Sequence, residues 1–218
     1  MKNETKNMEE FMIRENLRTY IENVVLKEYD KNESGHGIKH IRYVIKRSLE
    51  FAEQCKDINV EMVYTIAAYH DIGHHIDAKN HEKVSAEMLE KDEKLKEFFS
   101  DEEIKIMKEA VEDHRASSDH EPRSIYGKIV SSADRGTNIK DALMRTYSYN
   151  LKHNPQPKQD AIIEECRLHM IDKFGKKGYA TEKMFFKDEE YSKYLDEMDR
   201  LANNKEEFYK TMREVIGK

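Results

Sequence analysis

The chain has 218 residues, of which 38% are hydrophobic and 38% charged, and its formal net charge at pH 7 is -6. This length is enough for one sizeable domain, and because acids and bases are interspersed without a basic arm, no nucleic acid polymer is expected as a partner. No apolar stretch approaches the roughly 20 residues that span a bilayer, so no membrane partner is expected either.

Helical periodicity runs through most of the chain. Only three prolines and eight glycines interrupt it, and no segment shows the period-2 pattern of a half-buried strand. The sequence therefore predicts an all-α fold, a single helical bundle with additional C-terminal helices. The helices are expected at residues 9–28, 38–56, 60–71, 81–91, 101–114, 123–134, 138–150, 160–174 and 188–216.

The helix at residues 60–71 stands out because it is the least charged part of the chain. Such a helix is expected to be central and buried, and Asn59 is placed to cap its N-terminus. Farther along, Asp101 and the two acidic residues after it suit the start of another helix.

The chain is expected to divide into three parts of one domain. Residues 1–35 would form an N-terminal helix on the core, residues 36–150 the core itself, and residues 151–218 a C-terminal helical extension. The segment 153–157, His-Asn-Pro-Gln-Pro, marks the link to this extension. The amphipathic pattern beyond it fits packing on the core, a cover over a pocket mouth or a dimer contact, so a homodimer stays open.

The cysteines and the N-terminus indicate a reducing compartment. Cys55 and Cys166 are too far apart in the sequence to suggest a metal or redox pair. The first seven residues are polar and lack the apolar core of a signal peptide. A cytoplasmic location is therefore expected.

An adjacent imidazole and carboxylate, His70 and Asp71, close the apolar helix. Val63, Ala67, His70 and Asp71 follow one another at i, i+4, i+7 and i+8, which places the His-Asp doublet on the buried face at the helix end. Borderline metals accept this mixture of nitrogen and oxygen ligands. The doublet alone is weak evidence for a metal site, so the prediction depends on further ligands nearby.

Three other helices each present a ligand-type side chain from or beside an apolar face: His40, His114 and Asp134. A lone buried His is usually a hydrogen-bonded core residue, and a lone Asp at a helix end is usually a cap or an ion-pair partner. Five such groups on four helices are harder to explain separately, because an unpaired buried polar group costs about 1–3 kcal/mol. A shared metal ion would satisfy them together.

The order of these residues resembles the HD-domain superfamily of metal-dependent phosphohydrolases. Residues 35–44, Gly-His-Gly-Ile-Lys-His-Ile-Arg-Tyr-Val, are similar to its opening His-x-x-x-Val segment. Residues 68–73, Ala-Tyr-His-Asp-Ile-Gly, match its doublet motif, and residues 132–135, Ser-Ala-Asp-Arg, match its closing Asp. The resemblance covers about residues 36–150.

This resemblance implies an α-helical core that binds a divalent metal through His40, His70, Asp71 and Asp134. The identity of the metal stays open among Mn, Fe, Mg, Ni, Co and Zn. One or two ions per chain are expected.

His81 and His114 decide how many ions bind. In metal-rich branches of the superfamily, additional histidines between the doublet and the closing Asp bind a second metal. Each of these two histidines is thus a candidate for a second-metal ligand or for a phosphate contact. If both bind metal, Asp71 would be the bridging carboxylate. Asp71 and His114 are the candidate catalytic residues.

The positive charge for a phosphate has no single obvious source. Many relatives carry Lys after the glycine of the doublet motif, but this chain has His74 there. His74, Lys79, Arg115 and Arg135 are therefore the candidate substrate-binding residues.

The remaining polar groups near the motifs have ordinary interpretations. His36, His75 and His120 are expected to be exposed loop residues, and His36 is the best alternative candidate because it lies one helical turn before His40. Asp77 and Asp113 are expected to be surface carboxylates, or else acceptors that orient imidazoles.

The resemblance favours hydrolysis of a phosphate ester or anhydride in a small phosphorylated substrate, with a nucleotide among the options. Two alternatives stay open. One is a diiron oxygenase on the same fold, and the other is a non-catalytic module that binds a nucleotide. The sequence does not choose the substrate, because one fold hosts several activities.

Overall fold

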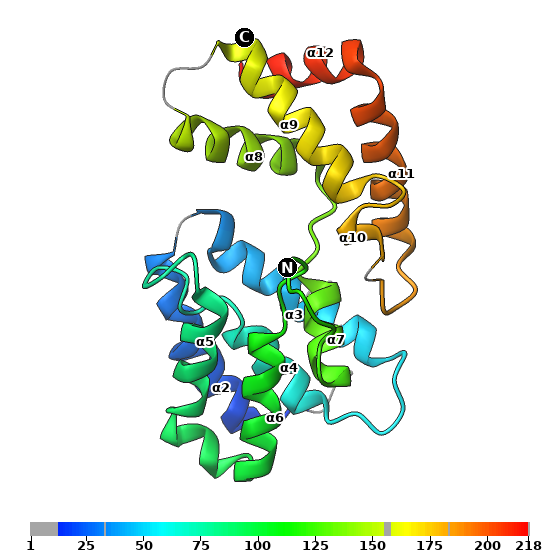
Figure 1. Ribbon diagram of the computed structural model, residues 1–218. Coiled ribbons are helices and arrows are strands. Elements are labelled where there is room, and N and C mark those ends of the chain that lie inside the picture. The colour runs from blue at the N-terminus through cyan, green and yellow to red at the C-terminus, as the bar shows by residue number, and fades with distance from the viewer. Residues whose placement is uncertain (1–12, 33, 155–157, 183, 218) are drawn as a thin grey trace. The chain divides into compact units, whose positions relative to one another are not determined.

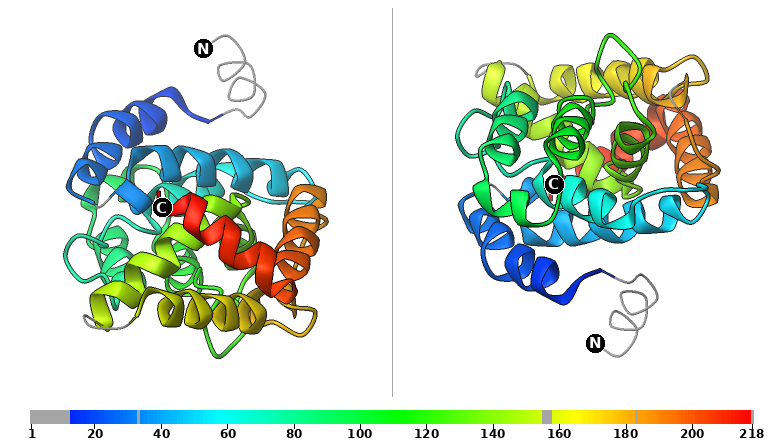
Figure 2. Two further views of the ribbon diagram at one scale, coloured as in Figure 1. Left: turned by 90° about the horizontal axis from the view of Figure 1, so that it is seen from above. Right: turned by 90° about the horizontal axis from the view of Figure 1, so that it is seen from below.

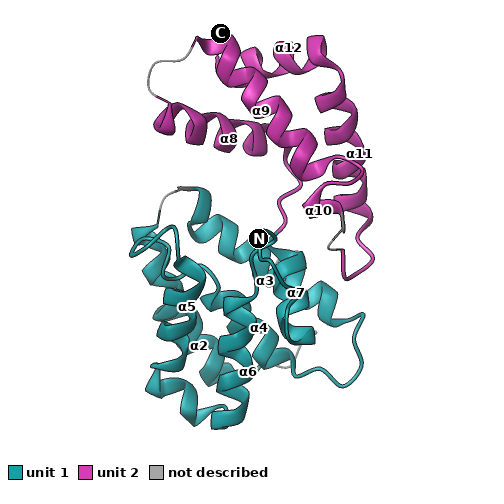
Figure 3. Cartoon of the chain, viewed as in Figure 1, with its two compact units in different colours: residues 1–134 teal, residues 135–218 magenta. Residues whose placement is uncertain are grey.

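The computed structural model describes residues 13–32, 34–154, 158–182 and 184–217, and every regular element among them is a helix (Figure 1, Figure 2). The predicted all-α fold is therefore confirmed. The chain divides into two compact units, residues 1–134 and residues 135–218 (Figure 3).

The first unit contains both the apolar helix and the His-Asp doublet. Its α-helices and 3-10 helices (η) are α2 (Glu15–Asn23), η1 (Val25–Lys31), η2 (Ser34–His36), α3 (Ile38–Ala52), α4 (Val60–Tyr69), α5 (His81–Glu90), η3 (Glu93–Glu97), α6 (Asp101–Glu112) and α7 (Ile125–Ala133). The second unit consists of α8 (Ile139–His153), α9 (Gln159–Phe174), α10 (Tyr179–Glu182), α11 (Glu189–Asn203) and α12 (Lys205–Val215).

Two of the predicted helices are wrong in extent. The helix expected at 9–28 ends as an α-helix at Asn23 and continues as η1, because Val24 leaves the helical region with φ -120°; residues 9–12 lie outside the described residues. The helix expected at 188–216 breaks at Asn204, whose side chain accepts a hydrogen bond from the backbone of Glu207 and caps a new helix. The other predicted helices agree to within a few residues.

Helix α4 is central to the first unit, as its composition predicts. It packs against α3, α5, α6 and α7, and every residue from Met62 to Tyr69 is buried. The Asn59 side chain accepts hydrogen bonds from two backbone N–H groups of the first turn, so the predicted cap is confirmed. The His-Asp doublet at the end of α4 therefore lies where several helices converge.

Gly73, two residues after the doublet, fixes how closely α5 approaches. A Cβ at this position would lie 2.7 Å from the Val84 Cγ1 atom and 2.9 Å from the Ser85 backbone nitrogen. The Gly73 N–H donates a hydrogen bond to Ser85 Oγ at 3.0 Å. The glycine thus lets the turn after α4 lie directly against the helix that begins at His81.

The second unit has its own apolar core, drawn from α8, α9, α11 and α12. Leu143, Cys166, Met198 and Phe208 are fully buried in it. Helix α8 belongs to this unit, whereas the sequence division places residues up to 150 with the metal-binding core. The three-part division itself stays a prediction. None of the helices in the described residues is long and apolar enough to cross a membrane.

Candidate metal centre

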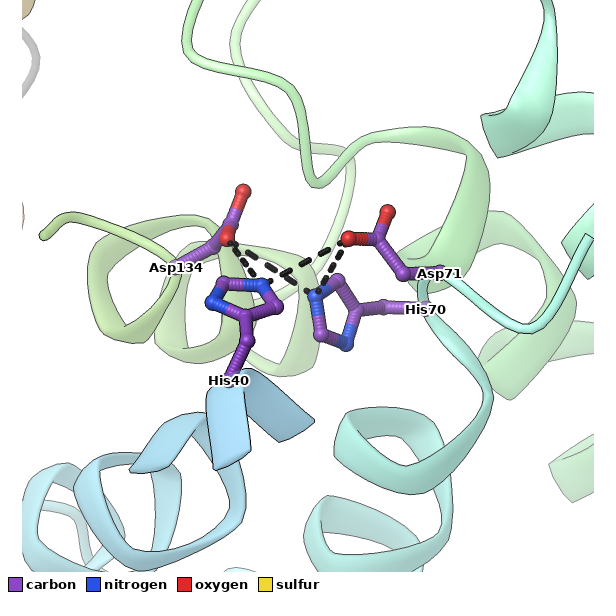
Figure 4. A group of neighbouring side chains, drawn as sticks. All are labelled: His40, His70, Asp71 and Asp134. Atoms are coloured by element: carbon purple, nitrogen blue, oxygen red, sulfur yellow. Dashed lines mark ion pairs between the residues drawn. The ribbon is translucent and has the colours of Figure 1, made fainter. Parts of the chain in front are cut away.

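Four predicted ligands from three segments of the first unit meet at one point (Figure 4). His40 comes from the first turn of α3, His70 and Asp71 follow α4, and Asp134 ends α7. His40 Nε2 lies 3.5 Å from Asp71 Oδ2 and 3.1 Å from Asp134 Oδ1. His70 Nε2 lies 3.5 Å and 3.7 Å from the same two oxygens. We call these four residues the first ligand group.

A second ligand group uses the other oxygen of Asp71. Asp71 Oδ1 lies 3.1 Å from His81 Nε2 and 3.5 Å from His114 Nε2. All three side chains are buried. Asp71 therefore faces one group with each oxygen, which is the geometry of a bridging carboxylate.

Three of the imidazoles share one tautomer. His70, His81 and His114 each place Nδ1 at 2.7–3.0 Å from the carbonyl three residues earlier in the chain. A carbonyl only accepts, so each Nδ1 carries the hydrogen and donates it. Each neutral ring consequently turns an Nε2 lone pair toward the site, as metal-bound histidines do.

The converging atoms do not satisfy one another. His40 Nε2, His70 Nε2 and Asp71 Oδ1 are buried and have no hydrogen-bond partner among the described residues. His81 Nε2 and His114 Nε2 lie 3.2 Å apart, and two neutral rings would repel there. Nitrogen and oxygen donors arranged in this way fit a divalent borderline metal.

The charges of the first ligand group reinforce one another. Burial disfavours the anionic form of Asp71, but the surrounding imidazoles outweigh burial and hold the pKa of its carboxyl well below the usual range. His40 and His70 depress the pKa of Asp134 against burial in the same way. Burial also disfavours a charged His40, yet the nearby Asp134 and Asp71 carboxylates raise the pKa of His40 to about 10. Both carboxylates are therefore anionic at neutral pH, as metal ligands must be.

The backbone of the doublet is held from outside by a tyrosine. The fully buried Tyr29 hydroxyl donates to the Ala68 carbonyl at 2.8 Å and accepts from the Asp71 N–H at 3.3 Å. This bridge fixes the chain where α4 ends, and it connects η1 to the site. Sequence periodicity gave no signal for it.

His36 is the residue of this region that the sequence interpretation missed. We expected an exposed loop residue, but its Nδ1 lies 2.7 Å from Asp71 Oδ2 and its side chain is only 31% exposed. The available signal was its spacing of one helical turn before His40.

His74, a candidate for a substrate contact, also lies beside the site. Its ring stacks on His36 with centroids 3.9 Å apart, and its centroid is 5.2 Å from that of His81. It is partly exposed.

The other three candidates for a phosphate contact have different surroundings. Arg115 donates to the Lys79 carbonyl at 3.0 Å and pairs with Glu82 at 3.2 Å, while the Lys79 side chain is exposed. Arg135 belongs to the second unit and donates to the Ala180 carbonyl there. Their roles in substrate binding stay predictions.

The remaining side chains have structural surroundings. His120 is exposed, as expected, and Asp77 accepts hydrogen bonds from the backbone just before α5. Asp113 is neither on the surface nor bound to an imidazole: it is buried and holds Arg123 through both carboxylate oxygens. Burial of its helix end against a neighbouring arginine was not visible in the sequence.

Comparison with known protein families identifies the family that this part of the chain resembles. Residues 37–139 match the family model described as the HD domain. This segment of the chain resembles an HD domain. The match contains both ligand groups in full, from His40 to Asp134, and the predicted resemblance is confirmed.

Two further comparisons complete this picture. The crystal structure of a predicted HD superfamily hydrolase from an uncultured Thermotogales bacterium is 25% identical to this chain, with a TM-score of 0.46. The similarity covers 59% of this chain and 73% of that protein. No curated protein sequence matches this chain significantly.

Proposed function

We propose that this protein is a metal-dependent hydrolase that cleaves a phosphate ester or anhydride in a small substrate such as a nucleotide. The observation that carries the proposal is the position of Asp71, whose two oxygens each face a separate set of imidazole ligands. Two cations held by one carboxylate suit hydrolysis at phosphorus, where the attacking and leaving oxygens both need charge stabilisation.

The two ligand groups would hold the ions. His40, His70, Asp71 and Asp134 would bind the first, while Asp71, His81 and His114 would bind the second. A bound divalent ion lowers the pKa of a water ligand and polarises a phosphoryl oxygen. The protein contributes fixed geometry, because the Nδ1 hydrogen bonds to backbone carbonyls hold three of the imidazole rings in place.

The chain also supplies groups beside the ions. Asp134 is 26% exposed, so the first ligand group is open to solvent on its side. His74, stacked on His36 and partly exposed, is the candidate donor to a phosphate oxygen. If a single ion binds in the first ligand group, His114 is free to move a proton at Nε2.

Metal analysis followed by a hydrolysis screen tests the proposal. Freshly purified protein should contain one or two divalent ions per chain and should release phosphate from a panel of nucleotides and phosphoesters. The double variant His70→Ala/Asp71→Ala should lose metal and activity together. The variant His120→Ala, in an exposed loop, is the matched control and should keep both.

Three results would contradict the proposal. One is full phosphate release by the metal-depleted double variant. Another is nucleotide binding without turnover across Mn²⁺, Mg²⁺, Co²⁺, Ni²⁺, Zn²⁺ and Fe²⁺, which would indicate a binding module. The third is oxygen consumption with substrate by anaerobically prepared iron protein that hydrolyses none of the panel, which would indicate an oxygenase.

A further inference from the structure

We infer that His36 is a positioning residue that orients the Asp71 carboxylate between the two ligand groups. This inference rests on the proposed function, because it concerns the same metal centre. It concerns a residue outside the family match, which begins one residue after His36.

The hydrogen bond has a defined direction. His36 Nδ1 lies 2.7 Å from Asp71 Oδ2, and an ionised carboxylate only accepts, so Nδ1 carries the hydrogen. A nitrogen that donates this hydrogen has no lone pair left for a metal. In agreement, His36 is in neither ligand group. His36 therefore acts on a ligand without being one.

Asp71 needs such a partner because its own torsion does not fix its oxygens. The terminal torsion of an Asp side chain is broad and roughly two-fold. Yet Oδ1 must face His81 and His114, while Oδ2 faces the first ligand group. The distance of 2.7 Å to His36 is shorter than any between this carboxylate and the imidazoles of the ligand groups, which are 3.1–3.5 Å. This contact selects the rotation in which Asp71 serves both groups.

His36 is itself held by neighbouring residues. The Asn32 side-chain NH₂ donates to the His36 carbonyl at 3.0 Å and to the Asp71 carbonyl at 2.9 Å. One amide thus ties together the backbones of the donor and the acceptor. The ring of His74 stacks on the His36 ring at an interplanar angle of 16°. These contacts set the ring at the distance that the hydrogen bond to Asp71 requires.

Hydrogen bonds to metal ligands from outside the coordination sphere typically change metal affinity by about 10–100-fold. We therefore expect His36→Ala to weaken metal binding by about this factor while the number of ions bound at saturation stays the same. His36→Asn places a side-chain N–H close to the Nδ1 position and should recover most of the affinity.

A titration of metal-free full-length protein with Co²⁺ tests this without measuring hydrolysis. The absorption of bound Co²⁺ gives the affinity, and elemental analysis at saturation gives the number of ions. His75→Ala is the matched control: His75 also contacts Asn32, through its backbone N–H and its ring, but it does not contact the Asp71 carboxylate. Its Co²⁺ affinity should match that of the wild type, and circular dichroism should show each variant folded.

Each other outcome overturns the inference. Wild-type affinity in His36→Ala removes the positioning role, and failure of His36→Asn to recover affinity does the same. Loss of one ion per chain at saturation would make His36 a ligand. Equal weakening in His75→Ala would assign the effect to loop damage. A wild-type protein that binds no ion overturns the proposed function as well, so the two failures are distinguishable.

Discussion

The two compact units bury different kinds of side chain. The first unit buries three imidazoles and the Asp71 carboxylate around the end of α4. In the second unit, the buried polar side chains among the described residues are Arg135 and Asp188, and both bond to nearby backbone. Its core is otherwise apolar. Buried polar groups lower the stability of the fold unless they are paired. A cluster of them therefore indicates a functional site.

The largest expected effect is on metal content, and it should differ between Asp71, which both ligand groups share, and His114, which only the second group contains. Asp71→Asn removes the charge that serves both ligand groups, so the protein should lose all tightly bound metal. His114→Ala removes a ligand of the second group only and should leave the first ion in place. Elemental analysis after dialysis checks the pair. Equal metal content in the two variants would show that Asp71 does not join the groups.

A core substitution in the second unit should have the opposite effect: it should lower stability without changing the metal content. Phe208 is fully buried in its core, and replacing a buried Phe by Ala typically costs about 3–5 kcal/mol of unfolding free energy. Phe208→Ala should therefore lower the stability of this unit in urea unfolding and leave the metal content of the folded protein unchanged. Metal loss at urea concentrations where the first unit is still folded would show that metal binding by the first unit depends on the second unit.

Some features of the first unit could be predicted from the sequence, and others could not. Helical periodicity identifies the apolar faces, so it locates α4, the ligand His70 at the end of α4 and the ligand His114 just after α6. The first ligand group follows from motif order. His36 was missed because it lies in η2, before α3 begins, and periodicity says nothing about where a loop places a side chain.

Short-range geometry was also hidden from the sequence. The break at Asn204 depends on a cap. Asn is favoured at caps, but within a helix its side chain can also point to solvent, so the residue type alone does not mark a break. The pairing of Asp113 with Arg123 depends on how the connection between α6 and α7 folds back. The sequence pattern alone shows which face of a helix is buried. Tertiary contacts decide which polar side chain pairs with a residue on that face.

The smallest expected effect tests how precisely the first unit sets the spacing of its helices. In Gly73→Ala, the added Cβ would lie 2.7 Å from Val84 Cγ1 and 2.9 Å from the Ser85 backbone nitrogen, so α5 must move away. Overpacking of this kind typically costs about 1–3 kcal/mol. Because His81 begins α5, we expect weaker binding of the second ion, with the first ion retained.

The double variant Gly73→Ala/Val84→Ala relieves the closest of these clashes. It removes the contact with Val84 Cγ1 but keeps those with Val84 Cβ and the Ser85 backbone nitrogen, so the affinity for the second ion should recover only in part. Urea unfolding and a Co²⁺ titration measure both quantities. A Gly73→Ala protein that loses stability but keeps wild-type affinity for both ions would show that the spacing of α4 and α5 serves packing and leaves the second ligand group untouched.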